Sequence, residues 1–207
     1  MVALSSSPQP SIMSDSVRVQ HLSLDSVYLP KLATLHAHCL PSTLTSNRGV
    51  KTIEGLYRLL LTHNHAIYAA LNGDDIVGGL VVTKAGVQSP TTLLVLHRPW
   101  SWLRVLGRLG PASFLEQVSD LATLRKQTGR YQPHDYITAL YISEQYRRTG
   151  VATALLRRCS AEAVSSKVGL GVDTAIRNEP ALRLYQSHGF TERFRTRLSV
   201  MLTQNVG

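Results

Sequence analysis

The chain has little that would cross-link it covalently or place it across a membrane. Its 207 residues include only two cysteines, Cys39 and Cys159, which lie far apart and belong to no motif. Disulfide-dependent secreted domains carry many more, so we expect reduced thiols and a cytoplasmic protein. No apolar run approaches the roughly 18 to 20 residues of a membrane-spanning helix. We therefore expect neither a disulfide scaffold nor a transmembrane segment.

We also expect no secretory signal in residues 1–16. Residues 1–16 are rich in Ser and Pro, and no basic segment precedes an apolar stretch there. We expect a disordered tail over 1–16, with Met13 as a second candidate for the start, and a single domain over 17–207. That length is enough for one substantial core, and a hydrophobic content of 43% is normal for a globular protein.

Acidic residues are scarce, with 13 Asp and Glu against 22 Lys and Arg, and the formal net charge is +9. A basic chain of this kind suits nucleic acid, an anionic membrane or a polyanionic small molecule. The sequence has no known DNA- or RNA-binding motif and no interleaved aromatic and basic residues, so we expect no specific nucleic-acid partner. Six arginines instead surround the two motifs described below: Arg147, Arg148, Arg157, Arg158, Arg177 and Arg183.

Several common ligand motifs are absent. The phosphate loop of nucleoside-triphosphate enzymes, the Gly-x-Gly-x-x-Gly of dinucleotide folds and the Gly-x-Ser-x-Gly of hydrolases do not occur. His36 and His38 are two residues apart, as are His63 and His65, and such spacing does not place two side chains on one helix face. No Cys or His spacing matches a zinc site, so we expect no metal.

Most of the chemical information lies in residues 146–156, YRRTGVATALL. They follow an apolar, strand-like run at 136–142 and open a helix-like run that reaches about Val164. The first amides of a helix have no intrahelical partners, and the helix dipole favours negative charge there. Gly150 permits a tight bend, Ala152 leaves the helix start uncluttered, and Arg147 and Arg148 add positive charge. This segment is suited to bind a diphosphate.

Two motifs together resemble a known family. Arg147, Gly150 and Ala152 resemble the acetyl-CoA signature Gln/Arg-x-x-Gly-x-Gly/Ala of the GNAT N-acetyltransferase superfamily. A second block at 178–190 resembles that superfamily's Asn-x-x-Ala-x-x-Leu-Tyr-x-x-x-Gly-Phe element. It matches at Asn178, Ala181, Leu184, Tyr185, Gly189 and Phe190. Asn178 and Pro180 also favour a helix start, and Gly189 a left-handed helix end.

The resemblance implies an α/β (α+β) fold with a mixed, mostly antiparallel central sheet flanked by helices. The apolar periodicity predicts the same order of elements. It gives a strand at 17–22, helices at 26–38 and 51–62, strands at 66–71 and 76–83 joined by a turn at 72–75, a strand at 136–142, the helix ending near 164, a strand at 170–175, the helix of the second motif, and a strand pair within 190–202.

Residues 88–134 depart from the family pattern, because most members join the third and fourth strands by a short turn. Amphipathic helices are predicted at 91–109 and 113–127. Three roles stay open for this insertion: a hairpin packed on the sheet edge, a lid over the acceptor site, or a surface at 100–109 that touches a membrane or a partner subunit in a homodimer. The insertion and the Leu-Tyr-x-x-Leu-Leu-like segment 56–61 are loosely similar to bacterial GNAT proteins that modify sugars and polysaccharides, which suggests an amino-sugar acceptor.

In function, the resemblance implies an acetyl-CoA-dependent N-acetyltransferase acting on a primary amine of a small molecule or a protein. Tyr185 would be the general acid for the leaving thiolate. Backbone amides near the end of the fourth strand would hold the acetyl group, amides of the following loop and helix would bind the diphosphate, and Asn178 would orient the cofactor or a loop. The cofactor-binding residues implied are Leu140, Tyr141, Ile142, Arg147, Arg148, Thr149, Gly150, Val151, Ala152, Thr153 and Asn178.

The sequence does not reveal the general base. Relatives often place Glu or His at the strand positions that correspond to Tyr136 and Thr138, and neither residue is a ready base near pH 7. Asp135, His134 and Glu144 lie nearby, but each is more simply a solvated residue at a strand end. A water chain is the other route for the proton. Because no base is evident, a non-catalytic acyl-CoA-binding sensor or interaction module is the alternative to an enzyme.

Overall fold

The computed structural model describes residues 17–40, 49–87 and 134–205. In chain order these residues form β1 (Val17–His21), α1 (Leu29–Cys39), α2 (Val50–Thr62), β2 (Ala66–Asn72), β3 (Asp75–Thr83), β4 (His134–Ile142), the short 3-10 turn η4 (Glu144–Tyr146), α6 (Val151–Ser165), β5 (Gly169–Ala175), α7 (Glu179–Ser187), β6 (Thr191–Arg195) and β7 (Ser199–Gln204). The seven strands make one sheet in the order β1-β2-β3-β4-β5-β7-β6. All neighbouring pairs are antiparallel except β4 and β5. The predicted fold class and element order are confirmed.

Local sequence explains where several elements begin and end. The β2–β3 hairpin turns through Gly73 and Asp74, and Gly73 has the positive φ of 61° that such a turn requires. Helix α1 begins at Leu29, three residues later than predicted, with Pro30 in its first turn. Helix α7 begins after Asn178, whose side chain accepts a hydrogen bond from the Ala181 amide at 3.3 Å.

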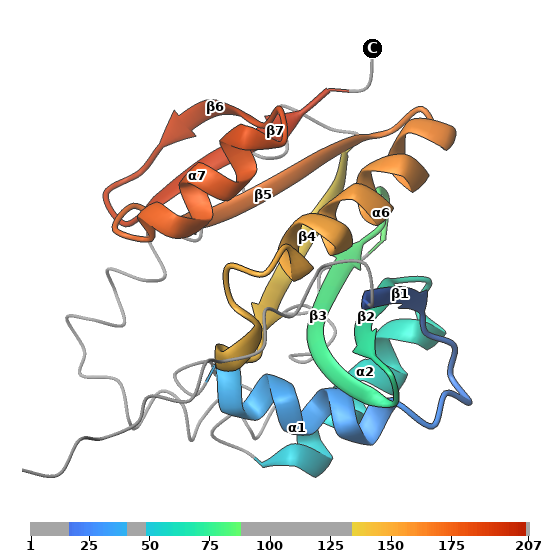
Figure 1. Cartoon of the computed structure of the whole chain (residues 1–207). Helices are drawn as coiled ribbons and strands as arrows, with labels where there is room; N and C mark the ends of the chain where they lie inside the picture. Colours follow the sequence, from blue (N-terminus) through green and yellow to red (C-terminus); the bar gives the residue numbers. More distant parts are fainter. Residues whose placement is uncertain (1–16, 41–48, 88–133, 206–207) are drawn as a thin grey trace, which may run out of the picture.

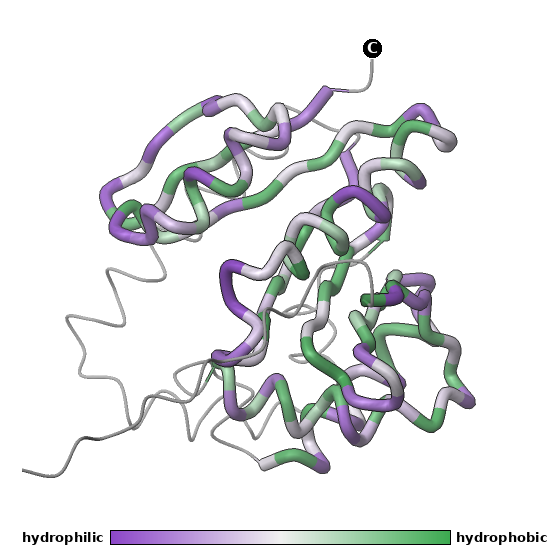
Figure 2. Tube along the Cα trace, viewed as in Figure 1, coloured by the Kyte–Doolittle hydropathy of each residue, from purple (hydrophilic) through white to green (hydrophobic). Residues whose placement is uncertain are grey.

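Helices cover both faces of the sheet (Figure 1). Helices α1 and α2 pack on one face, around a core that includes Leu32, Tyr57 and Tyr141. Helices α6 and α7 pack on the other, around a core that includes Leu155 and Tyr185. The long apolar stretches of β2 and β3 run between the two cores, and polar residues gather in the loops (Figure 2). Because strands at the centre of this arrangement are buried on both sides, β2 and β3 read as continuous apolar runs.

Two expectations near β4 are wrong. The strand begins at His134 rather than Tyr136, so His134 and Asp135 are strand residues and not loop residues. Asp135 is buried, and its carboxylate binds the Lys84 ammonium at 2.8 Å and the Ala85 amide at 2.9 Å. These contacts satisfy a charge that would otherwise be costly to bury. The predicted tail at 1–16 lies outside the described residues, as do the two helices predicted for the insertion at 88–134, of which only His134 is described.

Candidate active site

A bulge in β4 sets the geometry of the centre of the sheet. Ala139 pairs with Val81 and Ile137 pairs with Val82, so Thr138 has no counterpart on β3. The extra residue reverses the alternation of side chains, since Ile137 belongs to the core under α6 whereas Tyr141, four residues on, belongs to the core under α1 and α2. The Thr138 hydroxyl donates to the Val81 carbonyl at 3.1 Å. A bulge of this kind bends its strand and can end its pairing on the other edge.

The pairing of β4 with β5 ends at this bulge. Only residues 134–137 pair with 169–172, in parallel, and the two strands then part (Figure 1). We call the region between residues 138–142 of β4 and 173–175 of β5 the fork. Residues 173–175 stay paired with β7, so each arm of the fork is supported from its outer side only. Backbone donors on the inner edges of the fork are therefore not used by the sheet within the described residues.

The β4 arm is held in place from the α1 and α2 face. The Tyr141 hydroxyl meets the Tyr57 hydroxyl at 2.5 Å, and the Tyr57 hydroxyl lies 2.6 Å from Nδ1 of His36. Burial raises the pKa of both tyrosines and lowers the pKa of His36 to about 4, so all three groups are neutral near pH 7. The Tyr141 ring lies over Gly79, where a Cβ would come within 2.5 Å of the ring. We refer to His36, Tyr57 and Tyr141 as the hydroxyl chain.

The turn after β4 has the shape of an anion-binding site. It passes through Arg148, with φ of 64°, and Gly150, with φ of 90°, before α6 begins at Val151. The first intrahelical bond runs from the Ala154 amide to the Gly150 carbonyl, and no side chain caps this end of α6 within the described residues. The amides of residues 151–153 are therefore available to a ligand. Arg147 and Arg148 lie beside them in the chain and are exposed.

Contacts from other elements fix this turn. The Thr149 hydroxyl donates to the Tyr146 carbonyl at 2.7 Å, and the Asn72 amide group donates to the Tyr146 hydroxyl at 3.1 Å. The Cys39 thiol, at the end of α1, donates to the Ile142 carbonyl at 3.4 Å. The turn is thus tied to β2, and the end of β4 that leads into it is tied to α1. Figure 1 shows that β4 leads through this turn into α6.

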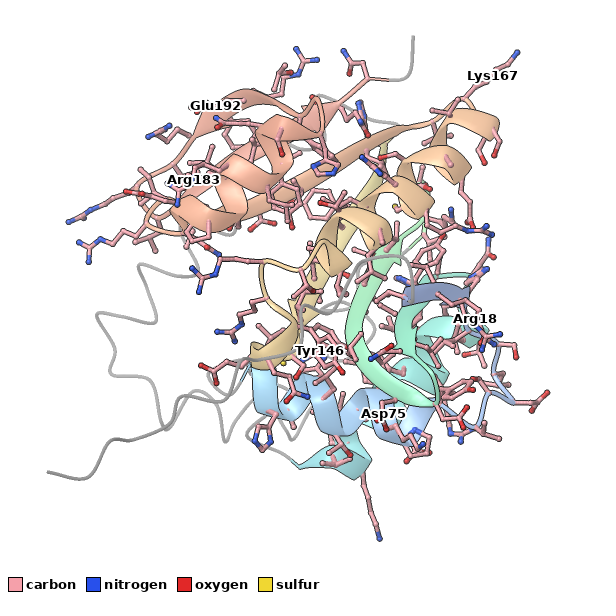
Figure 3. All side chains as sticks on the ribbon, viewed as in Figure 1. Arg18, Asp75, Tyr146, Lys167, Arg183 and Glu192 are labelled. Carbon is pink, nitrogen blue, oxygen red and sulfur yellow. The ribbon has the colours of Figure 1, made fainter. Side chains whose placement is uncertain are left out.

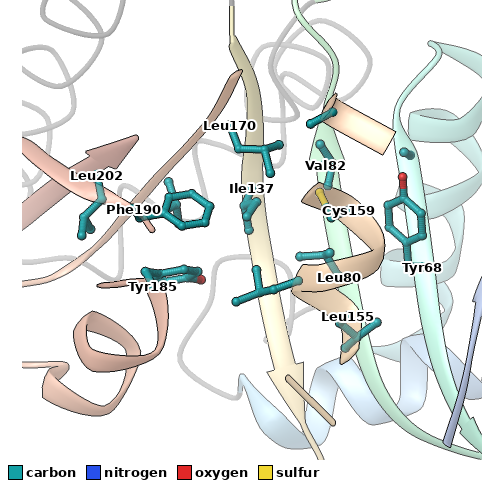
Figure 4. Close-up of a cluster of buried hydrophobic side chains, with 14 of the residues drawn as sticks. Tyr68, Leu80, Val82, Ile137, Leu155, Cys159, Leu170, Tyr185, Phe190 and Leu202 are labelled. Atoms are coloured by element: carbon teal, nitrogen blue, oxygen red, sulfur yellow. The ribbon is translucent and has the colours of Figure 1, made fainter. Parts of the chain in front are cut away.

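Tyr185 lies on α7, with 5% of its surface exposed. Its ring packs against Phe190 at a centroid distance of 5.4 Å, and its hydroxyl points toward β4 (Figure 4). Burial is the main cause that raises its pKa, and the nearby Asp173 carboxylate raises it further. The hydroxyl therefore keeps its proton near neutral pH, which is what a general acid requires.

Asp173 is a residue that sequence reasoning missed. It is the first residue of β5 beyond the last pair with β4, it is exposed, and its carboxylate accepts a hydrogen bond from the Tyr136 hydroxyl at 2.5 Å. The Tyr136 hydroxyl also meets the sulfur of Met201 at 3.7 Å, and its ring lies over Gly171. One signal was available in the sequence, because Asp173 is the one charged residue in an otherwise uncharged strand at 169–175.

The structure brings together most of the predicted site residues and separates others. Residues 140–142, the turn 147–153 and Tyr185 all surround the fork. Asn178 caps α7 and its amide donates to the Ala175 carbonyl at 2.8 Å, so it joins the end of the β5 arm to α7. Glu144 is exposed in η4, as expected, whereas Asp135 is engaged by Lys84 on the far side of the bulge.

The comparisons agree with this geometry. The profile of the Acetyltransferase (GNAT) family matches residues 32–190. The chain therefore belongs to the GNAT acetyltransferase family, and it is an acyltransferase that uses acetyl-CoA as the acetyl donor. The predicted family membership, enzyme class and donor are confirmed. No curated protein matches the sequence.

Solved structures with the same fold share little sequence with the chain. An N-acetyltransferase from Staphylococcus aureus Mu50 is 13% identical, with a TM-score of 0.60 over 92% of this chain and 99% of that one. The ribosomal-protein-S18-alanine N-acetyltransferase from Escherichia coli is 12% identical, with a TM-score of 0.55 over 92% and 95%. PaiA N-acetyltransferase from Thermoplasma acidophilum, solved in complex with coenzyme A, is 11% identical, with a TM-score of 0.55 over 92% and 99%. At these identities the likeness shows the fold alone.

No described helix combines the length and apolarity that a membrane crossing needs. No group of three or more His, Cys, Asp or Glu side chains in ranges 17–40, 49–87 and 134–205 could hold a metal ion.

Proposed function

We propose that the protein transfers the acetyl group of acetyl-CoA to a primary amine, by direct attack within the fork. The observation that carries this proposal is the joint presence of a parted strand pair, an uncapped helix start beside it and a protonated tyrosine pointing into the same region. The acceptor is an amine of a small molecule, an amino sugar included, or of a peptide.

The donor's diphosphate is assigned to the amides of the turn and the α6 start. The backbone bends at Arg148 and Gly150, the amides at the α6 start have no intrahelical partner, and Arg147 and Arg148 contribute charge, so we assign the diphosphate to the amides of residues 148–153. These residues fit the group, because α6 starts without a side-chain cap that a ligand would have to displace. Asn178 would orient the cofactor or the loop indirectly, because it joins the end of the β5 arm to α7.

The acetyl group is assigned to the inner edge of β4. The Ser143 amide donates to the Val77 carbonyl on β3, so strand alternation turns the amides of Ile142 and Leu140 toward the fork and that of Tyr141 toward β3. Leu140 and Ile142 would then polarise the thioester carbonyl, and Tyr141 would hold the strand through its hydroxyl. One preorganised donor of this kind contributes about 3 kcal/mol to a transition state.

Tyr185 is assigned as the general acid. When the carbon–sulfur bond breaks, the Tyr185 hydroxyl would give its proton to the sulfur. Its raised pKa keeps the proton available across the neutral range. Alignment of the amine and the carbonyl between the two arms would supply a further large share of the rate.

The test is thiol release from acetyl-CoA with a panel of primary amines: polyamines, amino sugars, lysine and peptides with free N-termini. We expect release with at least one amine and a mass increase of one acetyl group on it. Tyr185→Phe should lower kcat about 10²-fold or more and leave the affinity for CoA unchanged. Phe194→Leu, on the outer strand β6, is the matched control that changes a ring away from the fork. Unchanged turnover in Tyr185→Phe across pH would remove Tyr185 from this role.

A further inference from the structure

We infer that Asp173 is the general base of the reaction, and that Tyr136 is the positioning residue that orients its carboxylate. This assignment rests on the proposed function, because it names the group that takes the proton from the acceptor amine in the same fork. It supplies the base that the sequence did not reveal.

Asp173 and Tyr136 lie at the closed end of the fork, where the pairing of β4 with β5 stops. Asp173 follows Val172, the last β5 residue paired with β4, and Tyr136 precedes Ile137, the last β4 residue paired with β5. Their side chains meet across this closed end, where the Tyr136 hydroxyl donates a hydrogen bond to the Asp173 carboxylate. The carboxylate therefore lies where the two strands begin to part, at the closed end of the fork, and the Leu140 amide assigned to the reacting carbonyl lies three residues beyond Ile137 along the same arm.

Asp173 and Tyr185 belong to opposite faces of the sheet. Val172 and Ile137 point into the core under α6 and α7, so alternation turns Asp173 and Tyr136 to the opposite face. Tyr185 belongs to the core under α6 and α7. Asp173 and Tyr185 thus approach the fork from opposite faces, and they are close enough for the carboxylate to raise the pKa of the tyrosine. This arrangement suits direct transfer, because a base on one face can serve the nitrogen while an acid on the other face serves the sulfur.

Tyr136, which donates to the Asp173 carboxylate, is itself held in place by neighbouring strands. The Tyr136 ring packs on Gly171, where a Cβ would come within 3.0 Å of the ring, and its hydroxyl touches Met201 on β7. The donor to Asp173 is therefore fixed by two neighbouring strands. Asp173 itself is exposed, so an acceptor can reach it. The other nearby acidic residue in β4, Asp135, is committed to Lys84 and is buried on the α6 face.

The proton balance of the step is as follows. The acceptor enters as an ammonium ion and gives one proton to the Asp173 carboxylate, which leaves the nitrogen lone pair free. A nitrogen–carbon bond forms as the carbon–sulfur bond breaks, and the sulfur takes the Tyr185 proton. The second proton of the nitrogen returns to the Tyr185 oxygen, and Asp173 releases its proton to solvent. The products are an amide, a free thiol and one proton.

The experiment compares Asp173→Asn with wild type, using the best amine from the panel, between about pH 6 and pH 9. We expect kcat/KM of Asp173→Asn at pH 7 to fall by about 10² to 10⁴-fold. We also expect it to rise about tenfold per pH unit, since only amine already neutral in solution can react, while the wild type changes much less. Tyr136 and Tyr185, which face Asp173 from β4 and α7, both have raised pKa values and do not titrate in this range.

Controls separate this role from folding and from donor binding. Asp75→Asn makes the same chemical change at an exposed position in β3 and should keep wild-type turnover. Tyr136→Phe should lose about tenfold in kcat/KM but keep the flat pH profile, because the carboxylate remains. Calorimetry with CoA should give equal affinities for all variants.

Three results would overturn the assignment. Equal turnover in Asp173→Asn and wild type would show that Asp173 takes no proton, and the proposed function would stand. A loss in Asp173→Asn with the wild-type pH profile would reduce Asp173 to a structural role. Binding of CoA by the wild type without transfer to any amine would end the proposed function and this inference with it.

Discussion

At the scale of single residues, the buried polar side chains of the hydroxyl chain hold β4 in place. Tyr57 lies between Tyr141 of β4 and His36 of α1, so one hydroxyl connects the sheet to both helices on that face. All three side chains are buried. A buried hydroxyl that loses its partner costs more than the bond itself contributed, which makes the chain sensitive to single deletions.

Replacing Tyr57 by Phe should destabilise the protein by about 1–3 kcal/mol, since it removes the partner of the buried Tyr141 hydroxyl. Urea unfolding at pH 7 measures the change. Tyr28→Phe is the matched control, because Tyr28 is only half-buried and should change stability by less than about 0.5 kcal/mol. Equal effects of the two substitutions would contradict the role given to the chain.

His36 should make the fold sensitive to acid. Its pKa falls from 6.5 to about 4 on folding, mainly by burial, so between these values the unfolded state binds more protons. Stability is then greatest above pH 6.5 and declines as pH falls toward 4, by up to about 3 kcal/mol. Unfolding at pH 7 and pH 5 should show a smaller decline in His36→Gln than in wild type, and the same decline in both would exclude His36 as the cause.

At the scale of elements, β3 and β4 depend on each other through two glycines. A Cβ on Gly79 would come within 2.5 Å of the Tyr141 ring and 2.8 Å of Leu32, and one on Gly78 within 2.7 Å of Ile142. Tyr141 and Ile142 of β4 therefore pack directly against the backbone of β3 at its two glycines. The bulge at Thr138 turns the Tyr141 ring to the face where this space exists.

Gly79→Ala should destabilise the protein by about 1–3 kcal/mol, because the added methyl overlaps a buried ring that cannot move away. Gly55→Ala is the control within the same chain. Gly55 lies in α2 with nothing within 4 Å of the added methyl, so this change should stabilise by up to about 1 kcal/mol. Thermal unfolding of both variants measures the contrast, and a stable Gly79→Ala would mean that β4 shifts freely.

At the scale of the whole molecule, the sheet consists of two parts that share few bonds. Strands β1 to β4 form one part and β5 to β7 the other, joined by pairing at 134–137 with 169–172. Charged side chains such as Arg18, Asp75, Arg183 and Glu192 lie on the outside of both parts (Figure 3). A ligand bound as proposed would contact the α6 start and both arms of the fork, so we expect it to stabilise the two parts together.

CoA at about 100 times its Kd should therefore stabilise the protein by about 2.7 kcal/mol, which corresponds to a rise in Tm of roughly 5–10 °C. Pantetheine, which lacks the diphosphate, is the control and should give a much smaller rise at equal concentration. The rise with CoA should shrink in high salt, because the turn offers positive charge at the surface. Equal rises in Tm with CoA and pantetheine would contradict the assignment of the diphosphate to the α6 start.

Much of the fold could be predicted because its signals are local. The hairpin at Gly73, the cap at Asn178 and the left-handed Gly189 each depend on residues within one turn of chain. The bulge at Thr138 gave no such signal, since it depends on which face of β3 has room for Tyr141. Asp135 was misjudged for the same reason, because its partner Lys84 is 51 residues away in the chain.

The sequence by itself determined the family, the order of the elements and the turn that suits a diphosphate, because short patterns of glycine, arginine and apolar residues encode helix starts and strands. Only the tertiary structure decided that β4 and β5 part after four residue pairs, and that Asp173 meets Tyr136 at this point while Tyr185 approaches from the other face. These facts depend on register between β4 and β5, whose paired residues are 35 apart in the chain, and register is fixed by packing rather than by local propensity.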